Sequence, residues 1–253
     1  MYEFQRNWIY HTDCIAGMSL IPDGAVDMVL TDLPYGMTDC PWDSLLPLEE
    51  LWEQYWRALK PRGAVVLTAC QPFTTTLIQS QRRFFRYCWY WQKNQVTGFP
   101  FARFQPLRCV EDILVFYRQA PDYQPQGLVE LPPSQGKKQR KKAASAGEIY
   151  RGESLLREYT SRYTGYPRNL LSFPCQREGL HPTQKPVDLF AYLIRTYTRP
   201  GQLVLDSCMG SGTTAVAAIR EGRDYIGFEL DANYHRTAVE RAAAEQARKE
   251  TPS

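Results

Sequence analysis

The stretch LVLDSCMGSGTTAVAA, residues 203–218, decides the fold that the sequence predicts. An apolar run ends at Asp206, a turn containing Gly210 and Gly212 follows, and a helical pattern opens directly after it. Glycines let a backbone approach a ligand closely and adopt positive φ. Glu229 lies 23 residues after Asp206, at the end of the next apolar run, and acidic residues at about this spacing accept hydrogen bonds from ribose hydroxyls. These residues predict a nucleoside site across the carboxyl ends of two neighbouring strands.

Strands alternate with helices along most of the chain. The alternation predicts a Rossmann-like α/β fold, with a mostly parallel sheet covered by helices on both faces. Two further apolar and aromatic runs predict an antiparallel pair at one edge of that sheet, in which the aromatic residues belong to the core rather than to a base-stacking platform. The expected buried strands are 26–30, 63–69, 201–206 and 224–230, the edge pair is 86–93 and 112–118, and the helices are 46–63, 185–201, 213–222 and 231–249.

The chemistry of the glycine-rich turn favours one kind of nucleoside. A dinucleotide site normally reads G-x-G-x-x-G and holds a pyrophosphate on the helix N-terminus. Here the third glycine is missing, and Asp206 would repel a phosphate but attract an ammonium group. S-adenosylmethionine carries a sulfonium, an ammonium and a ribose but no phosphate, so it fits better than NAD. The alternative is a turn with a purely structural role.

Composition excludes several classes of protein. The chain has 253 residues, 43% hydrophobic and 23% charged, with a net charge of +3 and a mean hydropathy of −0.45. No run of about 18 apolar residues and no signal-peptide pattern is present, which predicts a cytoplasmic protein. The seven cysteines form no C-x-x-C pair and there are three histidines, so no disulfide framework or metal site is expected.

Positive charge is concentrated in one segment. Residues 133–180 hold ten Lys or Arg and four Glu, a net of +6, so the rest of the chain carries about −3. The segment starts with SQGKKQRKKAASAG, residues 134–147, which is polar and aperiodic. The simplest interpretation is a solvated loop, but such loops also contact phosphate backbones.

A second stretch, TDLPYG at residues 31–36, follows the first apolar run. Asp, Pro and Gly suit a turn after a strand, but a turn needs no tyrosine. The combination of Asp32 and Tyr35 predicts a site for a flat, polar group.

Taken together, the sequence resembles the amino-group DNA methyltransferases, which methylate adenine N6 or cytosine N4. TDLPYG is similar to their D/N/S-P-P-Y/F motif, DSCMGSGTT to their D-x-F-x-G-x-G-T-T motif, and HPTQKP (181–186) to the motif before the cofactor helix. The order of the motifs is that of the permuted β group. The resemblance divides the chain into a catalytic half (1–119), a basic variable insertion for target recognition (120–175) and a cofactor-binding half (176–253).

The resemblance implies a role for each matching residue. The target amine is held by the Asp32 carboxylate and the Leu33 carbonyl, beside Pro34, while Tyr35 stacks on the base. Leu33 replaces a proline of the family motif, but Pro34 keeps it extended, so its carbonyl retains its direction. The residues expected at the cofactor are Asp13, His181, Thr183, Lys185, Asp206, Cys208 (in place of an aromatic), Gly210, Gly212, Thr213, Phe228 and Glu229. Asp13 as a helix cap and Lys185 as a solvated surface charge are the structural alternatives.

Double-stranded DNA is the expected partner, and the target base has to be flipped out of the duplex to reach such a site. The resemblance also allows a homodimer and a cognate restriction endonuclease. The loop 94–106, with three phenylalanines, could contact flanking nucleotides. The residues expected at DNA are Lys93, Arg103, Lys137, Lys138, Arg140, Lys141, Lys142, Arg162 and Arg168.

Several alternatives stay open at this stage. Asp32, rather than the serine more common in the N4-cytosine enzymes, favours adenine N6 over cytosine N4. Methylation of RNA or of a glutamine side chain poses the same chemical problem, although the permuted order and the basic insertion argue against glutamine. From other classes, an NAD-dependent oxidoreductase and a catalytically silent DNA-binding protein are the alternatives.

Overall fold

The computed structural model describes residues 3–37, 43–132, 138–139, 159–160, 162–176 and 184–251, with backbone alone for 138–139 and 159–160. The chain divides into two compact units. The larger comprises Met1–Gln124 and Asn169–Ser253, and the smaller comprises Pro125–Arg168.

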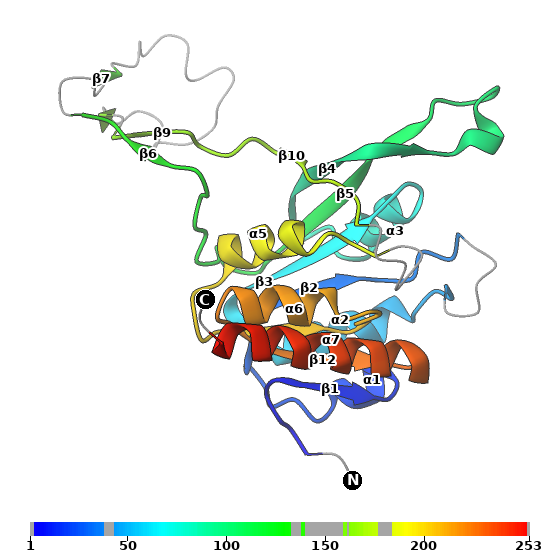
Figure 1. Cartoon of the computed structure of the whole chain (residues 1–253). Helices are drawn as coiled ribbons and strands as arrows, with labels where there is room; N and C mark the ends of the chain where they lie inside the picture. Colours follow the sequence, from blue (N-terminus) through cyan, green and yellow to red (C-terminus); the bar gives the residue numbers. More distant parts are fainter. Residues whose placement is uncertain are drawn as a thin grey trace. The chain divides into compact units, whose positions relative to one another are not determined.

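An eight-stranded sheet forms the centre of the larger unit in the described part of the chain (Figure 1). Every neighbouring pair is parallel except β3–β5 and β4–β5, which confirms the predicted α/β class. The spatial order is β1 (Trp8–His11), β12 (Asp224–Glu229), β11 (Leu203–Asp206), β2 (Val26–Asp32), β3 (Leu59–Ala69), β5 (Arg108–Phe116), β4 (Phe85–Thr97) and β10 (Leu170–Ser172).

Helices cover both faces of this sheet and enclose two hydrophobic cores. In β2, Met28 and Leu30 face one core while Val29 faces the other, as expected for a parallel strand buried on both sides. On the first face lie α5 (Val187–Tyr197), α6 (Thr213–Arg220) and α7 (Ala232–Glu250), and on the second α1 (Cys14–Met18), α2 (Leu48–Ala58) and α3 (Phe73–Ser80).

Local chemistry explains where two of the helices begin and end. Asp231 caps α7, as predicted, because its carboxylate accepts hydrogen bonds from the backbone N–H groups of Asn233 and Tyr234 at 2.8 and 3.0 Å. The helix expected over 46–63 ends instead at Ala58, and β3 begins at Leu59. Pro61 disfavours helical geometry at the residue before it, so the chain is extended before the proline is reached.

The sheet edge differs from the prediction. The antiparallel pair β4–β5 exists, but β10 pairs in parallel with β4, so β4 is an inner strand. β10 comes from residues 170–172, which were expected to belong to the insertion. Its three residues are too few for a periodic pattern. The strand β1 and the helix α3 were not predicted either, because they are short and weakly periodic. The aromatic run does belong to the core, since Trp89 and Trp91 are buried.

The smaller unit contains two short antiparallel pairs. β6 (Val129–Glu130) pairs with β9 (Tyr163–Thr164), and β7 (Lys138–Gln139) pairs with β8 (Tyr159–Thr160). The N–H of Leu131 donates to the carbonyl of Arg162 at 2.8 Å and extends the first pair. The role of this segment as a target-recognition region stays a prediction.

Two absences hold for the described residues. None of their helices combines the length and apolar character needed to cross a bilayer. No group of three or more His, Cys, Asp or Glu side chains in this part of the chain is arranged to hold a metal ion.

Candidate active site

The TDLPYG loop and the glycine-rich turn meet at one cavity. β2 and β11 are parallel neighbours, with Leu205 opposite Val29, so the loops that follow Asp32 and Asp206 leave the same edge of the sheet. Both loops line a cavity of about 580 Å³. Ligands bind at this carboxyl edge in open α/β sheets, and pockets for small molecules have this size.

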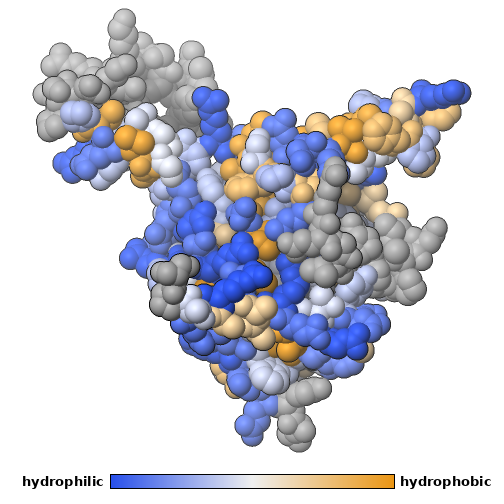
Figure 2. Space-filling model, viewed as in Figure 1, coloured by the Kyte–Doolittle hydropathy of each residue, from blue (hydrophilic) through white to orange (hydrophobic). Residues whose placement is uncertain are grey.

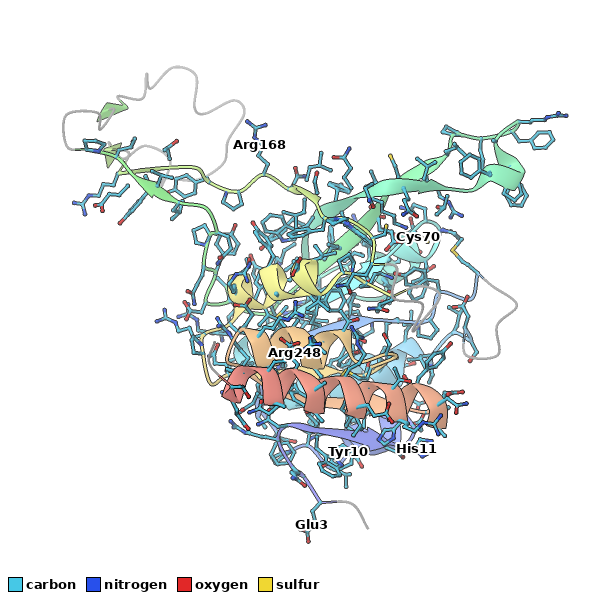
Figure 3. All side chains as sticks on the ribbon, in the orientation of Figure 1. Glu3, Tyr10, His11, Cys70, Arg168 and Arg248 are labelled. Atoms are coloured by element: carbon cyan, nitrogen blue, oxygen red, sulfur yellow. The ribbon has the colours of Figure 1, made fainter. Side chains whose placement is uncertain are left out.

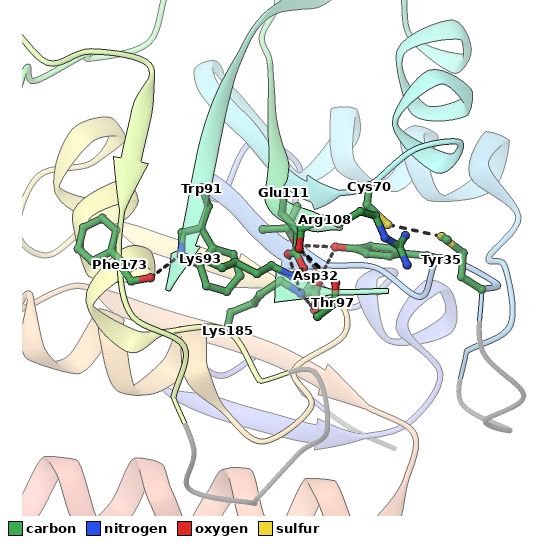
Figure 4. Close-up of polar contacts among 12 residues, drawn as sticks. Asp32, Tyr35, Cys70, Trp91, Lys93, Thr97, Arg108, Glu111, Phe173 and Lys185 are labelled. Carbon is green, nitrogen blue, oxygen red and sulfur yellow. Dashed lines mark hydrogen bonds and ion pairs between the residues drawn. The ribbon is translucent and has the colours of Figure 1, made fainter. Parts of the chain in front are cut away.

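Asp32 is held at both of its carboxylate oxygens (Figure 4). Its Oδ1 accepts hydrogen bonds from the hydroxyls of Tyr35, at 2.6 Å, and of Thr68. Its Oδ2 accepts one from Lys185 Nζ at 2.6 Å. The three donors come from the loop after β2, from β3 and from the residue that precedes α5 by two positions, so segments distant in sequence fix this carboxylate.

Lys185 is a buried cation rather than a solvated surface charge, since 5% of its side chain is exposed. Burial alone would lower the pKa of its ammonium group, but Asp32 and Glu111 outweigh burial and raise that pKa above its ordinary value. The lysine therefore stays charged. Its carbonyl accepts the hydroxyl of Thr213 at 3.4 Å, which ties this residue to the start of α6.

Tyr35 is held at both its backbone and its ring. Asp43 accepts hydrogen bonds from the N–H groups of Tyr35 and Gly36, at 2.7 and 2.9 Å, and so fixes the loop. The ring of Phe73 lies 5.4 Å from the Tyr35 ring, centroid to centroid, and Lys185 Nζ lies 5.6 Å from the same centroid. Burial, then Asp32 and Glu111, raise the pKa of the phenol, so it remains a hydrogen-bond donor. Stacking of a base on this ring stays a prediction.

The two residues between Asp32 and Tyr35 differ in exposure. Leu33 is buried in the core under the cavity, and Pro34 is half-buried; both line the cavity. A leucine in place of the expected proline is explained by this burial, because its side chain packs against apolar neighbours.

The glycine-rich turn is organised by two carboxylates. Asp206 is buried and accepts hydrogen bonds from the N–H of Cys208, at 3.0 Å, and from the hydroxyl of Thr214. Burial raises the pKa of its carboxyl group to about 6, against the lowering effect of these donors. Glu229 accepts the N–H of Gly210 at 2.7 Å and that of Asp231 at 2.8 Å, and burial raises its pKa as well.

Gly212 is required by both conformation and space. Its φ is +87°, which disfavours other residues, and a Cβ there would lie 2.9 Å from the Cα of Ala238 on α7. The turn therefore packs directly against α7.

The apolar lining of the cavity includes the predicted Phe228 and a leucine that the sequence analysis did not predict. Phe228 borders the cavity and is fully buried, and its ring stacks on that of Tyr10 with the two centroids 5.6 Å apart. Tyr10 lies in β1, the strand drawn in blue (Figure 3). The contact of Phe228 with an adenine ring stays a prediction. Leu230, which the sequence did not single out, borders the cavity with 69% of its surface exposed. Cys208 also lines it, and a hydrogen bond with Cys14 followed by burial raises the pKa of its thiol.

Asp13 was expected either at the cofactor or as a helix cap, and its position is compatible with both. Its carboxylate caps α1 by accepting the N–H of Ala16 at 2.9 Å, and the residue also borders the cavity.

The residues expected at DNA fall in three places. Lys93 lies in the cavity, forms an ion pair with Glu111 and is 14% exposed, whereas Arg103 is exposed in the hairpin between β4 and β5. Arg162 and Arg168 are exposed in the smaller unit. The remaining expected residues lie outside the described part of the chain, or have only their backbone described in the case of Lys138: Lys137, Arg140, Lys141, Lys142 and, at the cofactor, His181 and Thr183.

Sequence reasoning missed two polar residues that pair with side chains of the cavity. Thr68 is the polar residue near the end of an apolar strand, and it lies directly opposite Asp32 in the β2–β3 register. Glu111 stands beside Asp112 in β5, and two adjacent acids before the apolar end of a strand were a signal that could have been followed.

The comparisons with known proteins agree with this geometry. A family model described as DNA methylase matches residues 26–240. The DNA adenine methyltransferase YhdJ of Escherichia coli (strain K12) is 29% identical over 254 residues, which cover 92% of this chain and 81% of YhdJ. The M1.HpyAVI–SAM complex superimposes with a TM-score of 0.60 at 24% identity, covering 92% of this chain and 98% of that one. The cytosine-N4-specific PvuII DNA methyltransferase superimposes with a TM-score of 0.65 at 18% identity, and the match covers 98% of this chain and 93% of that one. The two structures show the fold alone.

Proposed function

Because this chain belongs to the N6/N4 DNA methylase family, we propose that it methylates the N6 amino group of adenine in double-stranded DNA, with S-adenosylmethionine as the methyl donor. The observation that carries this proposal is the Asp32 carboxylate, held by three donors at the cavity that also contains the glycine-rich turn.

The residues of the cavity fit this cofactor. Asp206 and Glu229 supply negative charge where an ammonium group and ribose hydroxyls need acceptors, and Leu230 supplies apolar surface for an adenine ring. When bound, the cofactor supplies an electrophilic methyl group on a positively charged sulfur.

Asp32 and the Leu33 backbone carbonyl activate the target amine. The lone pair of an exocyclic amine is delocalised into the base, which makes the nitrogen a poor nucleophile. Two acceptors that bind both N–H groups favour a tetrahedral nitrogen whose lone pair points away from the ring plane. Holding nitrogen and methyl carbon in line supplies much of the acceleration. Asp32 also stabilises the positive charge that develops on nitrogen, and the proton is then lost to water.

The depth of this site supports the proposal that the target base is flipped out of the duplex. Asp32 has 23% of its side chain exposed, so the edge of a base stacked inside a duplex does not reach it. Extruding a base costs a few kcal/mol, and stacking on the Tyr35 ring would offset part of this cost.

The β4–β5 hairpin is a second candidate DNA contact. Phe99, Phe101 and Phe104 at its tip are 65%, 58% and 87% exposed, with Arg103 among them. Figure 2 shows hydrophobic surface along this projecting arm. Thr97 and Arg108 at the base of the hairpin border the cavity, so the arm continues directly from the site. DNA-binding proteins use the same combination: apolar side chains insert between base pairs, and cationic side chains bind phosphates.

We also propose that the enzyme belongs to a restriction–modification pair and works with a cognate endonuclease. A strain that tolerates the nuclease gene only together with this chain would support the pairing.

The proposed target base is tested by expressing the chain in a host that lacks its own methylases and sequencing the genome with a method that detects N6-methyladenine and N4-methylcytosine. We expect N6-methyladenine in one short motif, abolished by Asp32→Ala. The matched control is Asp23→Ala, since Asp23 is an exposed carboxylate paired with Arg57 away from the cavity, and it should leave methylation unchanged. If only N4-methylcytosine is found, the target base is cytosine, the second candidate, and not adenine.

A further inference from the structure

The hydrogen bonds of Asp32 raise a question about how a substrate amine reaches it. Oδ1 already accepts two hydroxyls and Oδ2 already accepts the ammonium group of Lys185. A carboxylate oxygen has about two lone-pair sites, so Oδ1 is filled and the amine has to bind Oδ2, directly beside the ammonium group of Lys185. The lysine also lies 5.6 Å from the centre of the Tyr35 ring, where a stacked base would have to fit.

Glu111 offers the lysine a second partner. Its Oε1 pairs with Lys93 on the neighbouring strand β4, whereas its Oε2 is buried and receives no hydrogen bond from the described residues. Lys185 Nζ lies 3.5 Å from that Oε2, within ion-pair distance but beyond a hydrogen bond (Figure 4). Buried carboxylate oxygens normally have hydrogen-bond partners, so an unsatisfied one beside an ammonium group needs an explanation.

We propose that Glu111 is a positioning residue that takes over Lys185 when the target amine binds Asp32. This proposal rests on the proposed function. In the free enzyme Lys185 holds Asp32 in place, and in the complex with DNA it moves to Oε2 of Glu111 and leaves Oδ2 to the amine.

Distance and charge make this exchange easy. Charge-assisted hydrogen bonds are about 2.8 Å long, so Nζ has to move by about 0.7 Å from its present 3.5 Å to bind Oε2 of Glu111, and further to break its hydrogen bond of 2.6 Å with Oδ2 of Asp32. Two carboxylates, Asp32 and Glu111, face two ammonium groups, Lys93 and Lys185, so these four groups carry no net charge before or after the move.

Without Glu111, the exchange would be costly. Lys185 would have to leave Asp32 for a buried position with no carboxylate to receive it, and an unpaired buried charge is strongly destabilising. The lysine would then remain on Asp32 and compete with the amine.

The test measures the single-turnover rate of methyl transfer, from enzyme preincubated with S-adenosylmethionine, to a duplex containing the motif found by genome sequencing. We expect Glu111→Gln to lower this rate roughly 10- to 100-fold, the equivalent of one hydrogen bond to a charged group. Affinities for the duplex and the cofactor should stay within about twofold, because the effect lies in the step after binding. Glu111→Asp should restore part of the rate.

Asp112→Asn is the matched control. It removes the neighbouring charge of the same strand, but Asp112 accepts a hydrogen bond from Thr74 and does not border the cavity. We expect it to retain the full rate. A wild-type rate in Glu111→Gln, or a loss confined to binding or melting temperature, would overturn the proposal. Absence of methylation by the wild-type chain would instead count against the proposed function.

A second measurement does not depend on a variant folding. In a structure of the wild-type chain with the same duplex and a non-reactive cofactor analogue, Nζ of Lys185 should lie within hydrogen-bond distance of Oε2 of Glu111. The target amine should bind Oδ2 of Asp32. Lys185 still bound to Oδ2, with the amine held elsewhere, would contradict the exchange.

Discussion

Replacing Asp206 by asparagine tests the proposal that the buried carboxylate at the end of β11 binds the cofactor. The carboxylate is 2% exposed and accepts hydrogen bonds from the N–H of Cys208 and the hydroxyl of Thr214. Burial outweighs both donors and raises its pKa from 3.8 to about 6. Asparagine keeps an acceptor for the N–H of Cys208 but cannot ionise.

The sign and size of the effect follow from this pKa. As pH rises, an unfolded chain loses the proton near 3.8, whereas the folded chain keeps it up to about 6. Across that window the stability of the wild type should fall relative to Asp206→Asn by about 3 kcal/mol, since one pKa unit corresponds to about 1.36 kcal/mol. The carboxylate is ionised above pH 6, which is the form that attracts an ammonium group.

Cofactor affinity should therefore have the opposite pH dependence to stability. Below pH 6 the dissociation constant for S-adenosylmethionine should rise about tenfold per pH unit in the wild type and stay flat in Asp206→Asn. Calorimetric titration from pH 5 to 7.5, with urea unfolding at the same pH values, measures both effects. Asp122→Asn is the control, since this carboxylate pairs with Arg199 at the surface and should not alter cofactor binding. A flat wild-type affinity over this range would refute the reasoning.

Two further predictions concern the backbone of the turn and the support of Asp32. Gly212→Ala should destabilise the fold by about 2–4 kcal/mol, since it combines a left-handed residue with overpacking against Ala238. Gly201→Ala, at φ +78° with nothing near the added Cβ, should lose only about 1–2 kcal/mol on chemical unfolding, and equal losses for the two variants would contradict the clash. Thr68→Val removes a buried hydroxyl that donates to Asp32 and should slow methyl transfer about tenfold, with an unchanged KM for the cofactor. An unaltered turnover number in steady-state assays would show that this hydroxyl is dispensable.

The sequence was most informative where secondary structure is long and periodic. Sequence patterns predicted the positions of three helices and four strands: α5, α6, α7, β2, β3, β11 and β12. Strands buried on both faces of a parallel sheet are continuous apolar runs, which are easy to recognise in the sequence. Short elements, such as β1 and β10, have no such pattern. Their conformation depends on partners elsewhere in the chain, as β10 does on β4.

In the candidate site, too, some features have a local sequence pattern and others depend on residues distant in the chain. The composition of the two loops indicated a cofactor turn and a catalytic loop, and parallel strand order implied that both leave one edge of the sheet. The partners of Asp32 were not readable in this way. Thr68 and Lys185, which bind Asp32, are 36 and 153 residues away from it in sequence, and Glu111, which pairs with the lysine, is 79 residues away. No local pattern shows that these side chains come together.

By itself, the sequence determined the class of fold, the order of the motifs and the chemical character of the two loops, because these depend on periodicity and residue type within short segments. Only the tertiary structure decided that Lys185 neutralises Asp32 and that Phe228 belongs to the core. It also decided that Oε2 of Glu111 lies beside the lysine without a hydrogen bond from the described residues. The physical reason is that charge pairing and burial depend on distances between side chains, which are set by the packing of strands and helices remote from one another along the chain.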